Sequence, residues 1–509
     1  MSTKSAFNGV VVLTLSLVIV KILSALYRVP YQNILGDAGL YAYQQIYPIV
    51  ALGVVLASNA IPSALTQILG GTEAQRLFIK RLMIVLQIMG AFCCITLFVS
   101  AEGLAKIMGD VALTPMIRAA SLSFLVVGML GVLRGYFQAK FEMNPPAFSQ
   151  VIEQMIRVSI ISVVILLFTQ QQLSIYQAGT WAILASTIGF LGATLFLWGG
   201  VRLPKGTLNQ TIHWRQFVIA TVIFALSQLI VILWQVVDSF TIINLLQHGQ
   251  SLSFHHAITQ KGIYDRGASF IQMGLIVTTT FCFVLIPLLT DTQKTGQFEQ
   301  MYSYANASLK ITIVISSASA IGLINLLPLL NHVFFKSNDL IVTLSIYMLT
   351  VIFVSLAMMY IALLEVQHQY RVILLGFGIG LMIKVILNVA LITTIGILGA
   401  SLATVLALVV FTVYLHRHMI HLYQMTALRK FYLKLVVALL VMTASVQLTH
   451  YLVPSMSRFG GLVELIISAT IGIASMVMSL VWMRILNENE WVHLPFGDKI
   501  INMMKGRQS

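Results

Sequence analysis

The stretch VVVLTLSLVIVKILSALYR, from Val10 to Arg28, carries two basic residues in an otherwise apolar segment. It is about as long as a helix must be to cross a hydrocarbon core of ~30 Å at ~1.5 Å per residue. A charge at the bilayer centre costs at least ~2.5 to 3.5 kcal/mol, so we expect Lys21 and Arg28 to face a polar interior. The stretch therefore predicts a membrane-spanning helix with one functional face.

Similar apolar runs fill the rest of the chain. Its 509 residues are 58% hydrophobic and only 9% charged, with a mean hydropathy of +0.92, whereas a soluble domain has about 25% charged residues. The sequence predicts an all-α polytopic membrane protein with 14 spanning helices, which begin near residues 7, 40, 78, 115, 147, 178, 216, 264, 304, 340, 370, 396, 431 and 460.

The basic residues indicate an orientation for these spans. If both termini are cytoplasmic, the inner segments hold 20 of the 30 lysines and arginines, among them Arg134 and Lys140. The outer segments hold only five, which are Lys106, Arg118, Lys261, Lys336 and Arg458. Cytoplasmic loops are typically enriched in basic residues, so cytoplasmic termini are predicted. These loops also explain the net charge of +14 without a nucleic-acid partner.

A weak internal repeat suggests two halves. Gln138 and Arg157 are 19 residues apart, as are Glu365 and Lys384, and each pair runs from a predicted inner loop into the following span. Transporters are often built from such parallel repeats. Chance similarity between apolar segments is the alternative explanation.

The repeat leads to a division of the chain into three segments. We expect a first six-helix lobe over residues 1–215, a second over residues 216–426, and two further helices with a cytoplasmic tail over residues 427–509. The longest outward polar stretch, from Gln247 to Lys261, lies where a two-lobed transporter would join its halves.

Five basic residues lie within or at the ends of predicted spans, and we treat them as candidate ligands of an anionic diphosphate. Arginine and lysine are the residues that hold phosphate groups. These candidates are Arg28, Arg266, Lys384, Lys21 and Arg157. A position at the membrane interface is the alternative explanation for three of these residues. Lys21 could extend its side chain to the interface, and Arg28 and Arg266 could be interfacial anchors.

The two deeper cations have different neighbours. Arg157 follows Glu153 by one helical turn, so an intrahelical ion pair is the alternative for it. Lys384 has no acidic residue one turn away on its helix, only Asn388, so it is expected to need a partner from another helix.

Further polar residues in the spans are candidates for a supporting role. Asp238 is expected to pair with Arg266 or Lys21, and Asn59 with Pro62 is expected to mark a kink, because proline removes a backbone hydrogen bond. The supporting set is Asp238, Glu153, Asn59, Gln235, Asn388 and Asp265.

Several enzyme classes are excluded by what the sequence lacks. It contains no P-loop, no cluster with metal-ligand spacing, and no arrangement of nucleophile and base. We therefore expect no enzyme activity, no cofactor and no metal.

Short motifs along essentially the whole chain carry a family resemblance. They are Leu26-Tyr27-Arg28 with Ile34-Leu35-Gly36, the stretch from Ile46-Tyr47-Pro48 to Ile61-Pro62, Arg134-Gly135-Tyr136-Phe137-Gln138 before Pro145, the run from Gln154 to Val158, and Tyr264-Asp265-Arg266. The chain resembles the polysaccharide transporter branch of the MOP flippase superfamily, most of all its MurJ and SpoVB type proteins of Gram-positive bacteria.

The resemblance implies a flippase of the bacterial plasma membrane for undecaprenyl-diphosphate-linked sugars, most prominently the peptidoglycan precursor lipid II. It also implies two six-helix lobes in a V around a cationic cavity, with the last two helices forming a groove for the lipid tail. Arg28 and Arg266 match arginines of the family by position. The second span lacks an arginine found in the best-known branch, and Ser269 stands where that branch has an acidic residue.

The partners implied are a polyprenyl-diphosphate-linked glycan, membrane lipids and cell-wall synthesis proteins, while coupling to sodium or protons is left open. Two other functions compete. A multidrug or cation exporter of the same superfamily would hold its substrate with buried carboxylates, and buried cations are expected to outnumber these here. A non-transporting scaffold of an envelope-synthesis complex would use the cations only as anchors, for which Arg157 and Lys384 are too deep.

Overall fold

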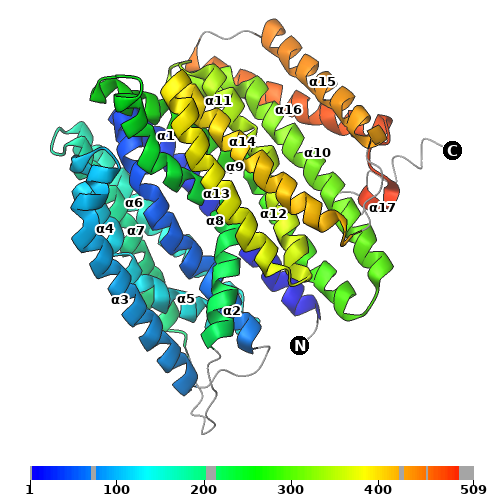
Figure 1. The fold of residues 1–509 in the computed structure, drawn as a ribbon, viewed down its shortest axis with the longest axis horizontal. Coiled ribbons are helices and arrows are strands. Elements are labelled where there is room, and N and C mark those ends of the chain that lie inside the picture. The colour runs from blue at the N-terminus through cyan, green and yellow to red at the C-terminus, as the bar shows by residue number, and fades with distance from the viewer. Residues whose placement is uncertain (1–2, 70–75, 202–213, 424–428, 454–456, 492–509) are drawn as a thin grey trace. The chain divides into compact units, whose positions relative to one another are not determined.

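A computed structural model describes residues 3–69, 76–201, 214–423, 429–453 and 457–491, and every regular element in these ranges is helical (Figure 1). The chain forms two compact units, Met1–Asp265 and Arg266–Ser509. This division is coarser than the predicted division into three segments, which stays a prediction.

The first unit contains α1 (Thr3–Val55), the π-helical turn η1 (Leu56–Ala60), α2 (Ile61–Leu69), α3 (Arg76–Ile107), the 3-10 turn η2 (Val111–Leu113), α4 (Thr114–Ser121), α5 (Phe124–Ala139), α6 (Asn144–Thr169), α7 (Ile175–Trp198), α8 (Trp214–His248) and the start of α9 (Phe254–Lys294). The second unit contains the rest of α9, α10 (Phe298–Leu330), the π turn η3 (Asn331–Phe335), α11 (Ile341–Met348), α12 (Thr350–Val366), α13 (Tyr370–Ile395), α14 (Ile397–Ile420), α15 (Arg429–Leu452), α16 (Arg458–Trp482) and α17 (Glu488–Trp491).

The predicted class, an all-α polytopic membrane protein, is confirmed. Within the described residues, twelve helical stretches are long and apolar enough to cross a membrane. They correspond to twelve of the 14 predicted spans. The remaining two, which begin near residues 7 and 264, fall on α1 and α9, where some of the side chains lie outside the described residues. The count of 14 therefore stays a prediction.

Helix α1 has two arms, residues 3–35 and 37–55, which meet at a sharp bend at Gly36. The first predicted span falls on the first arm, and the second predicted span begins on the second arm and continues into η1 and α2. The hydroxyl groups of Tyr27 and Tyr43 are 2.9 Å apart, although 16 residues of straight helix would separate them by about 24 Å. The backbone of Gly36 has φ +72° and ψ −174°, a region open essentially to glycine alone. Glycine at this position therefore permits the sharp bend that brings Tyr27 and Tyr43 together.

The segment before Pro62 forms the π turn η1, whereas the kink expected at Asn59 and Pro62 stays a prediction. Proline cannot donate a backbone hydrogen bond, and the wider turn just before it accommodates the interruption. The side chain of Asn59 is half-buried, and Ser58 beside it is buried.

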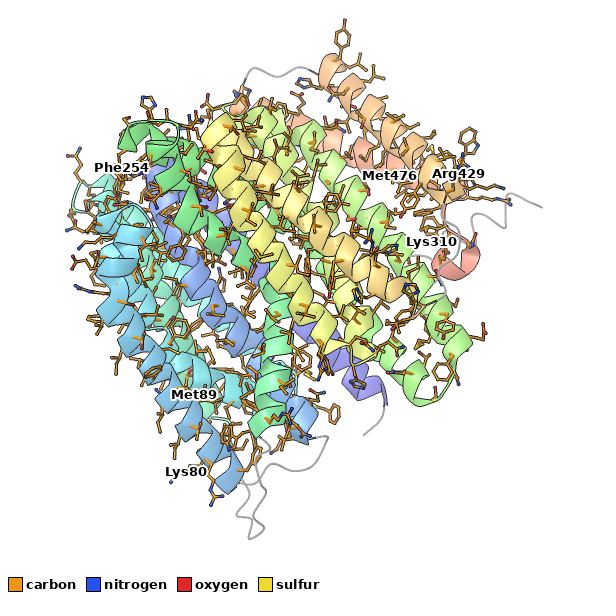
Figure 2. The ribbon with its side chains drawn as sticks, in the orientation of Figure 1. Lys80, Met89, Phe254, Lys310, Arg429 and Met476 are labelled. Carbon is orange, nitrogen blue, oxygen red and sulfur yellow. The ribbon has the colours of Figure 1, made fainter. Side chains whose placement is uncertain are left out.

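The core of the first unit forms around α5, which packs against α2, α3 and α7 and buries Leu130 and Leu133 completely. On the other side of α3, a row of apolar side chains that includes Met89 and Phe92 is exposed, as expected for a surface facing lipid (Figure 2). Helix α6 packs against both α1 and α7, which places its polar residues beside the arms of α1.

In the second unit, α13 packs against α14, which in turn packs against α12. Helices α15 and α16 form a pair beside α10 (Figure 1). Lys310 of α10 binds Glu490 of α17 with a Nζ to Oε1 distance of 2.7 Å (Figure 2). His450 of α15 and Glu464 of α16 form a further polar contact between the last two long helices.

Candidate functional site

Arg28 lies among four tyrosines, Tyr27, Tyr31, Tyr43 and Tyr47, which we call the tyrosine group. Its guanidinium is 5.2 Å from the ring centre of Tyr47, and its side chain is only 5% exposed. The rings of Tyr31 and Tyr47 lie 5.4 Å and 5.8 Å from that of Tyr43. A desolvated cation–π contact contributes about 2 kcal/mol. Arg28 is thus held in the protein interior and is not a surface anchor.

Arg157 lies near the middle of α6 and is also buried. Its Nη2 donates to Oε1 of Glu153 at 2.9 Å, so the predicted alternative of an intrahelical ion pair is present. Its Nη1 donates to Oε1 of Gln154 at 3.1 Å, and its guanidinium is 6.0 Å from the ring centre of Phe190. Gln154 in turn donates to Oγ of Ser24 at 2.9 Å, which connects α6 to α1.

Two of the five predicted cations, Arg28 and Arg157, are brought together by the tyrosine group. Both guanidinium groups interact electrostatically with the same three hydroxyl groups, those of Tyr27, Tyr43 and Tyr47. The arms of α1 and the middle of α6 therefore form one basic site within the first unit.

A third arginine belongs to this site, although the sequence analysis counted it only among the basic residues of the inner segments. Arg134 is in α5 and is completely buried. Its Nη2 donates to Oε2 of Glu153 at 2.9 Å. Helix α5 continues to Ala139, so Arg134 lies within the helix, while its predicted side of the membrane stays a prediction. The sequence could have indicated this position, because the predicted span that begins near residue 115 and ends 20 to 28 residues later includes Arg134.

The side chain of Lys21, the remaining candidate from α1, lies outside the described residues. Its predicted role stays a prediction.

The predicted supporting residues Asp238 and Asp265 belong to a separate, acidic region of the first unit. Asp238 accepts a hydrogen bond from the Tyr264 hydroxyl at 3.2 Å, and the two carboxylates interact electrostatically. Asp265 pairs with Lys261 at 2.5 Å. Lys261, expected in an outer loop, is only 3% exposed because α9 already begins at Phe254. Gln235, one turn before the buried Asp238, is half-buried.

Asp110 extends the acidic region towards α1. It accepts hydrogen bonds from the hydroxyl groups of Tyr41 at 3.2 Å and Tyr176 at 2.7 Å, and Tyr41 also interacts electrostatically with Asp265. Among the residues that the structure describes, no three acidic, histidine or cysteine side chains are grouped closely enough to hold a metal ion.

The expected excess of buried cations is not observed among the described residues, which do not include the side chain of Lys21. In the described residues six basic and six acidic side chains are buried. The buried charges are instead distributed unevenly within the first unit. The basic site holds three buried arginines and one buried carboxylate, Glu153, whereas the acidic region holds three buried carboxylates and one buried lysine, Lys261.

The second unit holds the other two candidates. Arg266 is 2% exposed, donates from Nη1 to the Ser337 hydroxyl at 2.7 Å, and lies 5.3 Å from the ring centre of Phe335. Lys384 and Asn388 are completely buried on one face of α13.

Lys384 has the partners on another helix that the sequence led us to expect. Its Nζ donates to the Thr404 hydroxyl at 2.6 Å and to the Ala400 carbonyl at 3.3 Å, both on α14.

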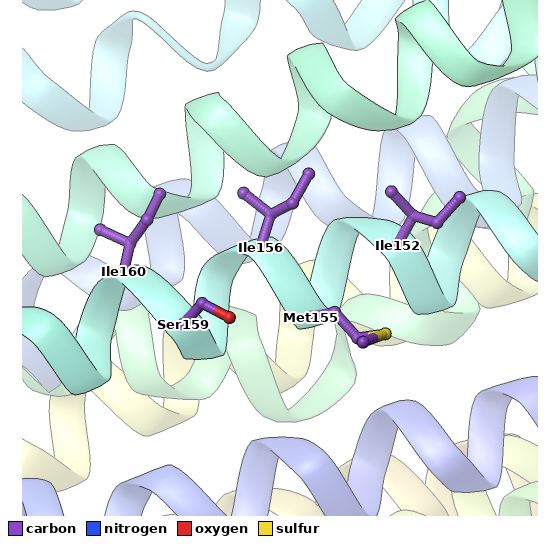
Figure 3. Close-up of a pocket in the computed structure, with 5 residues that line it drawn as sticks. All are labelled: Ile152, Met155, Ile156, Ser159 and Ile160. Atoms are coloured by element: carbon purple, nitrogen blue, oxygen red, sulfur yellow. The ribbon is translucent and has the colours of Figure 1, made fainter.

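A hollow of about 440 Å³ lies along α6 and is lined by Ile152, Met155, Ile156, Ser159 and Ile160 (Figure 3). Four of these five side chains are apolar, so the hollow cannot hold a diphosphate.

Comparisons with known proteins relate more than half of the chain to one family. Residues 6–293 match the family described as "Polysaccharide biosynthesis protein". The chain is 29% identical over 525 residues to "Uncharacterized membrane protein YabM" of Bacillus subtilis (strain 168), which covers 99% of this chain and 97% of that protein. It is 26% identical over 454 residues to "Lipid II flippase MurJ" of the same organism, covering 81% of this chain and 82% of the relative.

Solved structures share the fold. A "Lipid II flippase MurJ, inward closed conformation" has a TM-score of 0.68 at 16% identity, covering 93% of this chain and 99% of the other. An inward-facing multidrug resistance MATE family transporter of the MOP superfamily has a TM-score of 0.59 at 15% identity, covering 80% of this chain and 96% of the other. At these identities the likeness concerns the fold alone.

Proposed function

The chain belongs to the polysaccharide biosynthesis protein family of the MOP superfamily, and from this membership we propose that it is a lipid flippase. Its substrate is an undecaprenyl-diphosphate-linked glycan, lipid II or a related cell-wall or polysaccharide precursor. The protein moves this lipid from the inner to the outer leaflet of the bacterial plasma membrane, with both of its own termini in the cytoplasm. Its named relatives are a flippase and transporters, which agrees with the prediction that the chain is not an enzyme.

The observation that carries the proposal is the buried pair of Arg28 and Arg157 at one tyrosine group. With Arg134 included, the site has three guanidinium groups and one carboxylate, Glu153. The surplus positive charge complements a diphosphate diester, which is dianionic. Guanidinium groups bind phosphate oxygens through paired hydrogen bonds, which suits them to this role.

Arg266 and Lys384 are proposed as diphosphate ligands from the second unit, and Lys21 as one from the first. The half-buried or buried polar side chains Asn59, Gln235, Asn388, Asp238 and Asp265 are proposed to support the path of the polar headgroup.

The chemistry of the substrate sets the mechanism. The polyprenyl tail is stable in lipid, whereas the diphosphate and sugars need a polar surface to cross the bilayer. Alternating access, in which the protein exposes that surface to one side and then the other, meets this need. A membrane potential that is negative inside favours outward movement of negative charge by ~2.3 kcal/mol per charge per 100 mV.

Reconstitution into proteoliposomes tests the proposal. The purified protein is supplied with lipid II, with a second undecaprenyl-diphosphate-linked glycan, or with undecaprenyl monophosphate, and the leaflet position of each is followed by its accessibility to a membrane-impermeant reagent. We expect movement of at least one diphosphate-linked glycan and none of the monophosphate. If no diphosphate-linked lipid moves at a rate above that of empty vesicles, the proposal is wrong, and a scaffold function is favoured.

The buried carboxylates Asp238 and Asp265 give an observation in favour of a second candidate, a cation exporter like the MATE transporters. The same vesicles distinguish it. Export of a lipophilic fluorescent cation without movement of any lipid-linked glycan would replace the flippase proposal.

A further inference from the structure

We propose that Arg134 is a positioning residue that divides the charge of Glu153 and so preserves the positive charge of Arg157 for the substrate. The inference rests on the proposed flippase function and adds to it a residue that acts without touching the diphosphate. It concerns the three charged side chains Arg134, Glu153 and Arg157, which we call the charge triad.

The geometry of the triad is that of a shared carboxylate. Oε1 of Glu153 accepts from Nη2 of Arg157 at 2.9 Å, and Oε2 accepts from Nη2 of Arg134 at 2.9 Å. Each oxygen thus receives one arginine, and neither arginine forms the two-pronged pair with Glu153 that guanidinium groups favour. The side chains of all three residues are at most 6% exposed, so water screens these charges weakly.

Arg134 is bound on all three of its nitrogen atoms. Besides Glu153, its Nε donates to the Ser149 hydroxyl at 3.0 Å and its Nη1 donates to the Ser58 hydroxyl at 2.7 Å. Because these acceptors come from α6 and η1, the guanidinium is fixed between two elements. Its side chain is completely buried. Arg134 therefore cannot turn towards a substrate without losing several hydrogen bonds.

Arg157 differs from Arg134 because one of its N–H donors is not used in a hydrogen bond. Its Nε is buried and has no hydrogen-bond partner within the described residues. Its two other nitrogen atoms bind Glu153 and Gln154, and its guanidinium faces the tyrosine group that also surrounds Arg28. Of the two arginines in the triad, Arg157 is therefore the one placed to bind an anion.

Removal of Arg134 would change the charge at this site. Both oxygens of Glu153 would then be available to Arg157, and the buried pair would be neutral. With Arg134 present, two guanidinium groups and one carboxylate leave one net positive charge. Arg134 thus raises the net charge of the diphosphate site by pairing with Glu153, and it does so from a completely buried position on α5.

The test compares four forms of the full-length protein in nanodiscs: wild type, Arg134→Met, Glu153→Gln and the double variant. The probe is farnesyl diphosphate, a short polyprenyl diphosphate, and its affinity and the melting temperature are measured for each form. Arg118→Met, which removes an exposed arginine, is the matched control.

We expect the affinity to follow the net charge of the triad. Arg134→Met should bind farnesyl diphosphate about tenfold more weakly, because the triad becomes neutral. Glu153→Gln should bind at least as tightly as wild type. The double variant restores one net positive charge and should return to within about threefold of wild type. The control should be unchanged.

Three outcomes would overturn the inference. A double variant as weak as Arg134→Met would show that charge sharing is not the role of Arg134. Affinities that follow the melting temperature of each form, and not the net charge of the triad, would leave Arg134 a purely structural residue. If the wild type does not bind farnesyl diphosphate, the proposed function fails together with this inference. If the wild type binds it but the affinities of the variants do not follow the net charge of the triad, the inference alone fails.

Discussion

The hydroxyl groups of Tyr41 and Tyr43 interact with side chains of opposite charge, although only one residue separates the two tyrosines on α1. Tyr41 donates to Asp110, whereas Tyr43 contacts the Tyr27 hydroxyl and interacts electrostatically with Arg157. Residues two positions apart lie about 200° apart around a helix, so one arm of α1 separates the acidic region of the first unit from its basic site. The buried acidic and basic side chains, which are equal in number among the described residues, are thus kept apart within this unit.

Arg28→Ala should abolish transport of the lipid-linked glycan while leaving membrane insertion intact. The charge-assisted hydrogen bonds that an arginine makes to phosphate contribute about 1.5 to 3 kcal/mol each, so the rate should fall at least roughly tenfold. The leaflet-accessibility assay in proteoliposomes measures it. Arg118→Ala removes an exposed arginine of the same unit and should transport normally. Transport by Arg28→Ala at the control rate would contradict a role in binding.

Arg266→Ala makes the corresponding test in the second unit. Its side chain is fixed by the Ser337 hydroxyl and the Phe335 ring, so its charge has a defined position. We expect a loss of transport of similar size, measured in the same assay. Arg371→Ala, in an exposed position on α13, is the control. If both variants behave alike, Arg266 has no special role in transport.

Lys384→Met should separate stability from function. The Thr404 hydroxyl also donates to the Ala400 carbonyl at 2.8 Å, so loss of the ammonium group does not leave that carbonyl without a partner. The melting temperature should therefore change by only a few degrees, while transport falls at least about tenfold if the ammonium group binds the diphosphate. Lys430→Met, at an exposed position, controls for the loss of a lysine. A large fall in melting temperature with normal transport of the folded fraction would assign Lys384 to helix packing.

Gly36→Ala should destabilise the first unit through its backbone alone. An added Cβ would meet no atom within 4 Å, so no steric clash with neighbours is involved. The conformation with φ +72° and ψ −174° is nevertheless unfavourable for alanine by about 1 to 3 kcal/mol. Thermal unfolding in detergent measures the loss. Gly103→Ala, which is equally unobstructed but lies within α3, should be neutral or slightly stabilising. An equal effect of both changes would contradict this account.

Hydrophobicity was enough to predict the class and most of the spans, because each span must be apolar along its whole length. Arg28 and Arg157 could be recognised from the sequence as charges inside apolar runs, where a charge is costly. The resemblance of short motifs was enough to identify the family.

The arrangement of the site depends on tertiary contacts that the sequence does not display. Arg134 follows an apolar run and was counted only with the inner basic residues, whereas its partner Glu153 is on the next helix, 19 residues further along. Lys261 was assigned to a loop because the polar residues before it conceal the beginning of α9. In both cases a buried basic residue is neutralised by an ion pair, and local hydrophobicity cannot reveal such a pair.

The π turn η1 fixes the rotational phase of the second span. A π turn accommodates one residue more than an α-helical turn would, and one residue corresponds to about 100° of rotation. The turn therefore sets the angle between the face that carries Tyr43 and the face by which Ile61 packs against α5. Deletion of one residue between positions 56 and 60 would produce a regular α-helix, but it would turn one face away from its neighbours. The spacing of residues in this segment is thus as constrained as their chemistry.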